Sequence, residues 1–377
     1  MYPTLYHAIK DLFGLEIEFL KIVMMFGFFV ALAFLAANWV MTLELKRYEA
    51  EGKIKSFQRL VSKPNHVAEY ISSGAIGFLL GYKVVNLLLN LSKYSSDPQS
   101  YIMSLEGSWL WGILVAVVFL GYKYYELKNA PEFVEGSKET FHPYMMMGNM
   151  TILAALAGFA GAKVFHHLEN YEEFFADPMI LFQDIFSGLT FFGGLICGGA
   201  MVLWYANKHG VKWKHMLDIG GPAMMLAYGI GRMGCHFSGD GDWGIPNTSP
   251  KPDWLSWLPD WAWAYDYPHN VLDFQRGIPP TPLDPPVWPT PVYEISMALV
   301  IFAILWSIRK KFVPGVLFSI YLIFAGIERF AIEDIRTNPD QFEAVAFSQA
   351  ELISMGMMLL GLVGIFYFNK THKKQAA

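Results

Sequence analysis

Residues 231–244 read GRMGCHFSGDGDWG, which places an arginine near the end of an apolar run and continues into a glycine-rich acidic loop. An arginine at membrane depth costs about 3 kcal/mol or more unless an anionic group meets it. Glycines let the backbone turn tightly and let a ligand approach it closely. The stretch therefore predicts a membrane protein that holds a phosphate or a carboxylate beside Arg232.

The composition sets the class of protein. The chain is 54% hydrophobic and 16% charged, whereas soluble domains carry about 25% charged residues. Its apolar runs are about 20 residues long, the length that crosses a bilayer. The first run lacks a following small-residue cleavage site, so we expect it to be retained. The sequence predicts an all-α polytopic membrane protein with about nine spans, at 19–43, 67–91, 107–126, 146–166, 187–206, 216–236, 292–308, 314–334 and 348–368.

Lysine and arginine indicate the orientation, because cytoplasmic loops are enriched in both. With the N-terminus outside, and with Lys21 and Lys123 at the ends of spans counted with the adjoining segments, the inner segments hold eighteen of the 28 basic residues, the outer segments hold six, and four fall within spans. This bias predicts an N-out, C-in topology. Two cysteines, Cys197 and Cys235, are too few for a disulfide framework, and we expect them to be free and buried. No metal-ligand spacing, phosphate loop or basic nucleic-acid stripe is present, so we expect no metal, cofactor or nucleic acid.

Segment 239–291 is the one long outer loop and is rich in proline and tryptophan. Proline restrains a loop that has no secondary structure, and tryptophan favours the headgroup layer. We interpret the segment as a cap over the membrane site. An interfacial rim with no part in the chemistry is the alternative.

A second charged feature lies near the outer end of the eighth predicted span. Arg329, Glu333 and Arg336 have the spacing i, i+4 and i+7, which predicts one shared helix face, with Glu328 on another. A rise of about 1.5 Å per residue puts Arg329 and Arg232 at similar depth. Each arginine could simply pair with a carboxylate, as Arg329 with Glu333, and lock helices together. The matched depth favours an anion site instead.

These motifs resemble those of the prolipoprotein diacylglyceryl transferase family of bacterial inner membranes. Its signature, roughly G-R-x-G-N-F-x-N-G-E and then glycine, is similar to 231–244, with Asp240 for the glutamate and Gly244 one residue late. A second block, roughly Y-G-x-F-R-F-x-x-E-F-x-R-x-P-D, resembles 321–340 and matches at Arg329, Phe330, Glu333, Arg336, Pro339 and Asp340. Three shorter blocks, G-A-R, G-x-x-F-H-G-G-L and H-P-x-Q-L-Y-E, resemble 161–165, 188–195 and 288–294, in family order.

The resemblance also shows departures. Phe192 stands where the family has histidine, Trp288 and Pro291 replace a histidine and a glutamine, and Cys235 and Ser238 replace two asparagines. Roles of those polar groups do not carry over, whereas the arginines do, so we interpret the chain as a divergent member. The family has seven spans, and residues 60–140 are therefore interpreted as an inserted helix pair within a single membrane domain, 1–377.

The resemblance implies transfer of a diacylglyceryl group from phosphatidylglycerol to the lipobox cysteine of a prolipoprotein, with release of glycerol phosphate. This is the first step of lipoprotein maturation and takes place in the bacterial inner (cytoplasmic) membrane. We expect Arg232 and Arg329 to clamp the departing phosphate, because guanidinium binds phosphate oxygens bidentately and the developing charge needs donors already in place. A positive pocket also favours the thiolate of the acceptor cysteine.

The other candidate residues have expected roles around this clamp. Asp240 or His236 could assist thiol deprotonation, although we expect Asp240 to orient the loop and His236 to be a satisfied or solvent-facing side chain. Glu333 is expected to fix Arg329, and Arg336 to meet lipid headgroups. Expected substrate contacts also include Gly231, Gly234, Gly239, Gly193, Gly194 and Tyr293, with packing as the alternative for Tyr293.

The sequence also bears on two other classes of protein. A transporter would need a polar path to the inner face, but the charged residues concentrate near the outer ends and no internal repeat is evident. A non-catalytic lipid-binding or scaffold protein of the same fold stays open, because the missing histidine and asparagines could mean lost catalysis.

Overall fold

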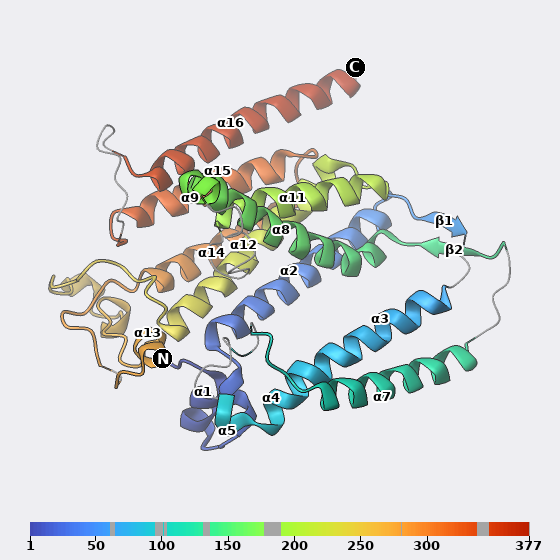
Figure 1. Cartoon of the computed structure of the whole chain (residues 1–377). Helices are drawn as coiled ribbons and strands as arrows, with labels where there is room; N and C mark the ends of the chain where they lie inside the picture. The colour runs from blue at the N-terminus through green and yellow to red at the C-terminus, as the bar shows by residue number, and fades with distance from the viewer. Residues whose placement is uncertain are drawn as a thin grey trace. The chain divides into compact units, whose positions relative to one another are not determined.

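The computed structural model describes residues 1–60, 65–94, 101, 104–130, 136–176, 190–279, 281–337 and 347–376 (Figure 1). Backbone contacts divide the chain into two compact units. The first comprises Met1–Pro3, Met25–Ser56 and His142–Ala377, and the second comprises Thr4–Met24 and Phe57–Phe141. All predicted site residues belong to the first unit.

The first unit is helical. Its long helices are α2 (Met25–Ala50), α8 (Met147–Glu169), α11 (Phe191–Lys208), α12 (Trp213–Ser238), α14 (Thr290–Ile308), α15 (Val316–Glu333) and α16 (Gln349–Ala376). Shorter elements are η3 (Pro143–Met146), α9 (Tyr171–Ala176), η4 (Asp253–Leu255), η5 (Asp260–Ala262) and α13 (Val271–Arg276).

The second unit is built around a helix pair. The helix α3 (His66–Leu79) continues through a π-helical turn, η2 (Leu80–Val85), into α4 (Asn86–Leu89) and packs against α7 (Trp109–Lys128). The strands β1 (Phe57–Leu60) and β2 (Lys138–Phe141) pair antiparallel, with Phe57 opposite Phe141. The unit also contains α1 (Leu5–Phe13), η1 (Glu18–Ile22) and α5 (Leu91–Tyr94). Its helix pair lies within the predicted 60–140 insertion, whose status as an insertion stays a prediction.

Six helices of the described residues are long and apolar enough to cross a membrane: Met25–Ala50, His66–Leu89, Trp109–Lys128, Pro143–Glu169, Thr290–Ile308 and Gln349–Lys373. They expose large apolar side chains such as Leu110 and Leu359, as expected of helices whose solvent is lipid. Helices α11, α12 and α15 also lie at predicted spans but do not meet this criterion; α15, for example, carries Glu328, Arg329 and Glu333. A total of nine spans and the N-out, C-in topology stay predictions.

Helix α12 packs against α2, α14 and α15. Met225 of α12 packs in one core cluster with Ala298 and Leu305 of α14 and Leu317 of α15. The close approach of α12 to α14 depends on Gly229, where an added Cβ would lie 3.1 Å from the Cβ of Ala298. This packing places the C-terminal end of α12 next to the start of α14.

A buried carboxylate fixes α12 against the start of α15. Asp218 accepts hydrogen bonds from the backbone N–H groups of Gly315 (2.7 Å) and Phe318 (2.9 Å). Gly315 is the N-cap of α15 and has no side chain to satisfy these N–H groups, which would otherwise lack partners. Asp218 therefore caps α15 from another helix and sets the position of one helix relative to the other.

Candidate active site

Arg232 lies on the last turns of α12, one turn after Tyr228. Its Nε donates to the Tyr228 hydroxyl at 3.3 Å, as the i, i+4 spacing on one helix face allows. The arginine side chain is 15% exposed. A guanidinium this buried needs anionic partners, because removing the charge from water is costly.

Two carboxylates meet Arg232, and Arg336 contacts the same two. Glu294, on the first turns of α14 and fully buried, places Oε1 3.1 Å from Nη2 of Arg232 and 3.0 Å from Nη1 of Arg336. Asp242, in the loop after α12, forms ion pairs with both guanidinium groups. We call Arg232, Arg336, Asp242 and Glu294 the arginine–carboxylate cluster.

The backbone around Gly244 holds Asp242 in this cluster. Gly244 N donates to Trp288 O at 2.8 Å, and Ile245 N donates to Ile335 O at 3.0 Å. A Cβ on Gly244 would lie 2.8 Å from Trp288 Cβ and would also meet the Ile335 carbonyl. Only glycine permits this approach. The loop is thereby bonded to the segments that precede α14 and follow α15.

The structure corrects the predicted helix face of Arg329, Glu333 and Arg336. Helix α15 ends at Glu333, and a turn follows in which Arg336 N donates to Glu333 O at 3.1 Å. The i+7 relation therefore does not apply to Arg336, which joins Arg232 and not Arg329. The side chain on α15 that contacts the Arg232 region is Glu328, whose Oε1 lies 3.2 Å from the Tyr228 hydroxyl.

Arg329 has a different partner. Its Nη1 lies 2.5 Å from Oε2 of Glu333, and the other oxygen of Glu333 accepts from the Ser348 hydroxyl at 2.7 Å. This is the contact expected if Glu333 fixes Arg329. It is also the helix-locking alternative, here between α15 and the start of α16. Pro339 and Asp340 of the same motif lie outside the described residues.

Asp240 and His236 lie beside the cluster. Asp240 accepts from the backbone N–H of Asp242 at 3.2 Å, a local turn that orients the acidic loop. Partial burial raises the pKa of Asp240 above its usual value, against the lowering influence of Cys235 and Arg232. His236 has Nδ1 3.4 Å from the Tyr267 hydroxyl, and its ring makes a tilted contact with Tyr265 and an edge-on contact with Tyr267 in the 239–291 loop.

The predicted glycines and Tyr293 have mainly packing contacts. Added Cβ atoms on Gly193 and Gly194 would meet the backbone of α8. The Cβ on Gly193 would lie 2.5 Å from the carbonyl oxygen of Gly161, and the Cβ on Gly194 would lie 3.3 Å from that of Gly158. Small residues that let helices approach closely are typical of membrane helix pairs. Tyr293 donates to Ala262 O at 2.8 Å, which ties α14 to the loop.

The signature glycines also differ from one another. A Cβ on Gly231 would enter open space, and one on Gly234 would lie 3.2 Å from Phe29 of α2. Gly239 ends α12 in the left-handed conformation, with φ of 63°, where glycine is favoured.

Of the cysteines, Cys235 is buried, whereas Cys197 is only half-buried, and both are free.

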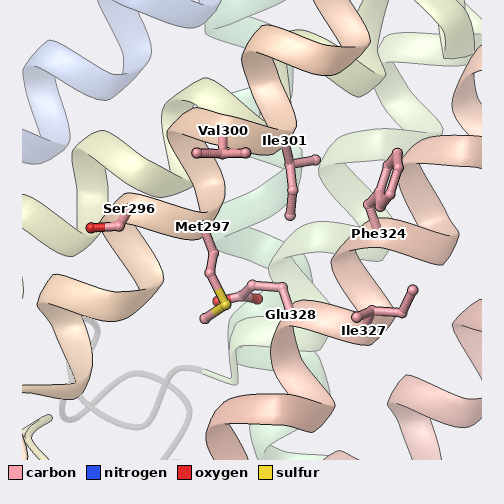
Figure 2. Close-up of a pocket in the computed structure, with 7 residues that line it drawn as sticks. All are labelled: Ser296, Met297, Val300, Ile301, Phe324, Ile327 and Glu328. Atoms are coloured by element: carbon pink, nitrogen blue, oxygen red, sulfur yellow. The ribbon is translucent and has the colours of Figure 1, made fainter. Parts of the chain in front are cut away.

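An apolar groove of about 320 Å³ lies between α14 and α15 (Figure 2). Its lining residues are Ser296, Met297, Val300, Ile301, Phe324, Ile327 and Glu328. The side chain of Glu328 extends from α15 toward Met297 of α14 (Figure 2). Glu328 therefore connects the groove to Tyr228 and, through it, to the arginine–carboxylate cluster.

Sequence reasoning gave no role to Asp242, Tyr228 or Glu328, and it included Glu294 only as the last residue of the matched block 288–294. Tyr228 was detectable, because a hydroxyl one turn before a buried arginine is positioned to contact it. Glu294 follows Tyr293 in a matched motif, and Asp242 belongs to the opening stretch. Nothing in the local sequence, however, distinguishes Asp242 from Asp240.

These features define a polytopic helical membrane protein with a buried arginine–carboxylate cluster near one end of its helices. The family model described as prolipoprotein diacylglyceryl transferase matches residues 108–367. The chain belongs to this family of transferases.

Individual relatives support the assignment. A phosphatidylglycerol–prolipoprotein diacylglyceryl transferase of Clostridium tetani is 27% identical over 259 residues, which cover 68% of this chain and 88% of the relative. That of Dehalococcoides mccartyi is 26% identical over 289 residues, 74% of this chain and 96% of the relative. That of Stenotrophomonas maltophilia is 29% identical over 237 residues, 58% and 72% of the two chains.

Proposed function

We propose that this protein transfers the diacylglyceryl group of phosphatidylglycerol to the thiol of a lipobox cysteine in a prolipoprotein, at a bacterial inner membrane. The thiol sulfur forms a thioether bond to the glyceryl carbon, the bond from that carbon to the phosphate oxygen breaks, and glycerol phosphate leaves. This is the first step of lipoprotein maturation. The observation that carries the proposal is the pair of guanidiniums, Arg232 and Arg336, that share two carboxylates in a member of this family.

The cluster suits the leaving group. Charge grows on the phosphate as the carbon–oxygen bond breaks, and donors already in place stabilise it best. Arg232 and Arg336 would bind the phosphate by replacing part of their contact with Asp242. Arg329, which pairs with Glu333 at the end of α15, would add positive charge to the site. Asp240 would orient the loop.

The experiment uses the purified protein in vesicles with labelled phosphatidylglycerol and a synthetic lipobox peptide. Covalent label on the peptide supports the transferase, whereas label retained only non-covalently supports a binding protein. Arg232→Ala and Arg336→Ala should each lower transfer at least about a hundredfold, the size of effect when one stabilising donor is removed. Full activity in both folded variants would refute the role of the cluster.

Arg329→Lys separates the two arginine sites. Because Arg329 pairs with Glu333 outside the cluster, this change should reduce transfer less than Arg336→Lys, where a bidentate guanidinium is replaced by a point charge. Equal losses in the two lysine variants would restore Arg329 to the clamp predicted from the sequence.

A further inference from the structure

Glu328 is a buried acid in an unusual position for this family. The family motif that residues 321–340 resemble has phenylalanine immediately before its arginine, whereas this chain has Glu328 before Arg329. The chain also has Phe192 where the family has a histidine. This chain therefore has no titratable side chain at position 192, where the family has histidine, and it has a titratable glutamate at position 328, where the family has phenylalanine.

Glu328 shares the hydroxyl of Tyr228 with a second acid, Glu294. The Tyr228 hydroxyl lies 3.1 Å from Oε1 of Glu294 and 3.2 Å from Oε1 of Glu328. A tyrosine hydroxyl has one proton and can donate to only one of the two. Tyr228 also accepts from Nε of Arg232. Both carboxyl contacts are hydrogen bonds at the same time only after one of the two carboxylates has taken up a proton.

Glu328 is the better placed of the two carboxylates to take up such a proton during the reaction, and before the reaction it accepts from Tyr228 as a charged carboxylate. Oε1 of Glu294 already contacts both Arg232 and Arg336, which favour its charged form. Glu328 is 4% exposed and lines the apolar groove. The charged and titratable groups that act on it are Glu294 of α14, Tyr228 and Arg232 of α12, and Arg329 and Tyr321 of α15.

We propose that Glu328 is the base that takes the proton from the acceptor thiol, reached through the groove between α14 and α15. The inference rests on the proposed transferase function. The S–H proton moves to the Glu328 carboxylate as the sulfur–carbon bond forms and the carbon–oxygen bond to phosphate breaks. The proton then passes through the Tyr228 hydroxyl to the departing glycerol phosphate beside Arg232. This transfer restores the Glu328 carboxylate.

The test compares Glu328→Gln with Glu328→Asp and with Glu126→Gln, an exposed glutamate of α7 paired with Lys123. Transfer from phosphatidylglycerol to a lipobox peptide is measured from pH 5.5 to 9, with kcat and KM for both substrates. Glu328→Gln should lower kcat at pH 6–7 by about 10²- to 10⁴-fold, the usual contribution of a general base. The deficit should narrow toward pH 8.5, about where a free thiol ionises. Glu328→Asp should keep part of the activity, and Glu126→Gln all of it.

A second acceptor isolates the proton transfer. A peptide with selenocysteine in place of cysteine has a more acidic nucleophile that needs no base, so the deficit of Glu328→Gln should largely disappear with it. Equal deficits for both peptides in a folded variant, or no deficit for either, would overturn the proposal.

The wild-type protein provides the test if Glu328→Gln does not fold. Its rate with the cysteine peptide should fall on acidification more steeply than its rate with the selenocysteine peptide, and parallel profiles would overturn the proposal. Failure of the wild type to form any thioether would refute the transferase function itself. An active wild type with an unaffected Glu328→Gln would refute only the role of Glu328.

Discussion

Replacing Glu294 with glutamine tests whether the arginine–carboxylate cluster holds the helices together. The side chain is fully buried, and its Oε1 contacts the guanidiniums of Arg232 (3.1 Å) and Arg336 (3.0 Å). Glutamine keeps the shape and one acceptor but removes the charge. The two arginines then face Asp242 alone, so the four-residue cluster changes from neutral to a net charge of +1.

The expected loss of stability follows from the burial of the Glu294 side chain. Removing one member of a buried ion pair costs about 3–5 kcal/mol, because a charge is left without compensation. We expect the lower end, about 3 kcal/mol in the free energy of unfolding, because Asp242 remains and the amide oxygen still accepts. The assay is thermal and denaturant unfolding in detergent micelles. Glu126→Gln, which removes an exposed pair with Lys123, should change stability by less than about 1 kcal/mol.

A double-mutant cycle shows whether the effect passes through Arg336. Glu294→Gln and Arg336→Met should be non-additive, with a coupling of about 1–3 kcal/mol, as for residues in one charge network. Glu294→Gln and Arg329→Met should be additive within about 0.5 kcal/mol. A Glu294→Gln protein as stable as the wild type, or coupling to Arg329 instead of Arg336, would refute the arginine–carboxylate cluster as a stabilising unit.

Three further predictions concern the glycines and the loop. Gly244→Ala should destabilise the loop and abolish transfer, because its Cβ would strike the Ile335 carbonyl oxygen and the Cβ of Trp288, whereas Gly231→Ala, with open space at its Cβ, should be neutral or slightly stabilising. Activity and unfolding temperature check both. Gly193→Ala should disrupt the α8–α11 contact, whereas Gly199→Ala should not. Because the predicted defect is in packing, the unfolding temperature should change more than the KM for lipid. A larger change in KM would favour substrate binding by Gly193. Burial raises the pKa of Asp240, so the folded state binds the carboxyl proton more tightly than the unfolded state does. The stability of the wild type should therefore fall as pH rises through that pKa. Asp240→Asn should flatten this pH dependence in unfolding measurements, and an unchanged slope would contradict the prediction.

The helical architecture could be predicted because apolar runs of bilayer length are a strong signal. The runs at 292–308 and 348–368 coincide closely with α14 and α16. The runs at 216–236 and 314–334 also coincide with α12 and α15, although the three charged residues of α15, Glu328, Arg329 and Glu333, exceed the number allowed in a span. Those charges belong to the site, so the residues that weaken the membrane signal are the ones that carry the proposed function.

The pairing of the arginines could not be predicted from the sequence. The expected face of Arg329 and Arg336 assumed that the helix continues to residue 336, and neither glycine nor proline intervenes to end it earlier. The helix ends at Glu333 because the chain that follows bonds to the loop, Ile245 N to Ile335 O. That bond is long-range, and the local sequence does not contain it.

The two acids of the cluster differ in a way that bears on the proposed reaction. Glu294 is fully buried on α14, whereas the Asp242 side chain is 30% exposed on a loop. Displacing Glu294 would leave a charge without solvent, but displacing Asp242 moves a carboxylate toward water, which solvates it. A phosphate that approaches Arg232 and Arg336 therefore competes with Asp242 and not with Glu294. Glu294 would keep the two guanidiniums at fixed separation while the exchange takes place, so the donors would need little rearrangement as charge develops on the leaving group.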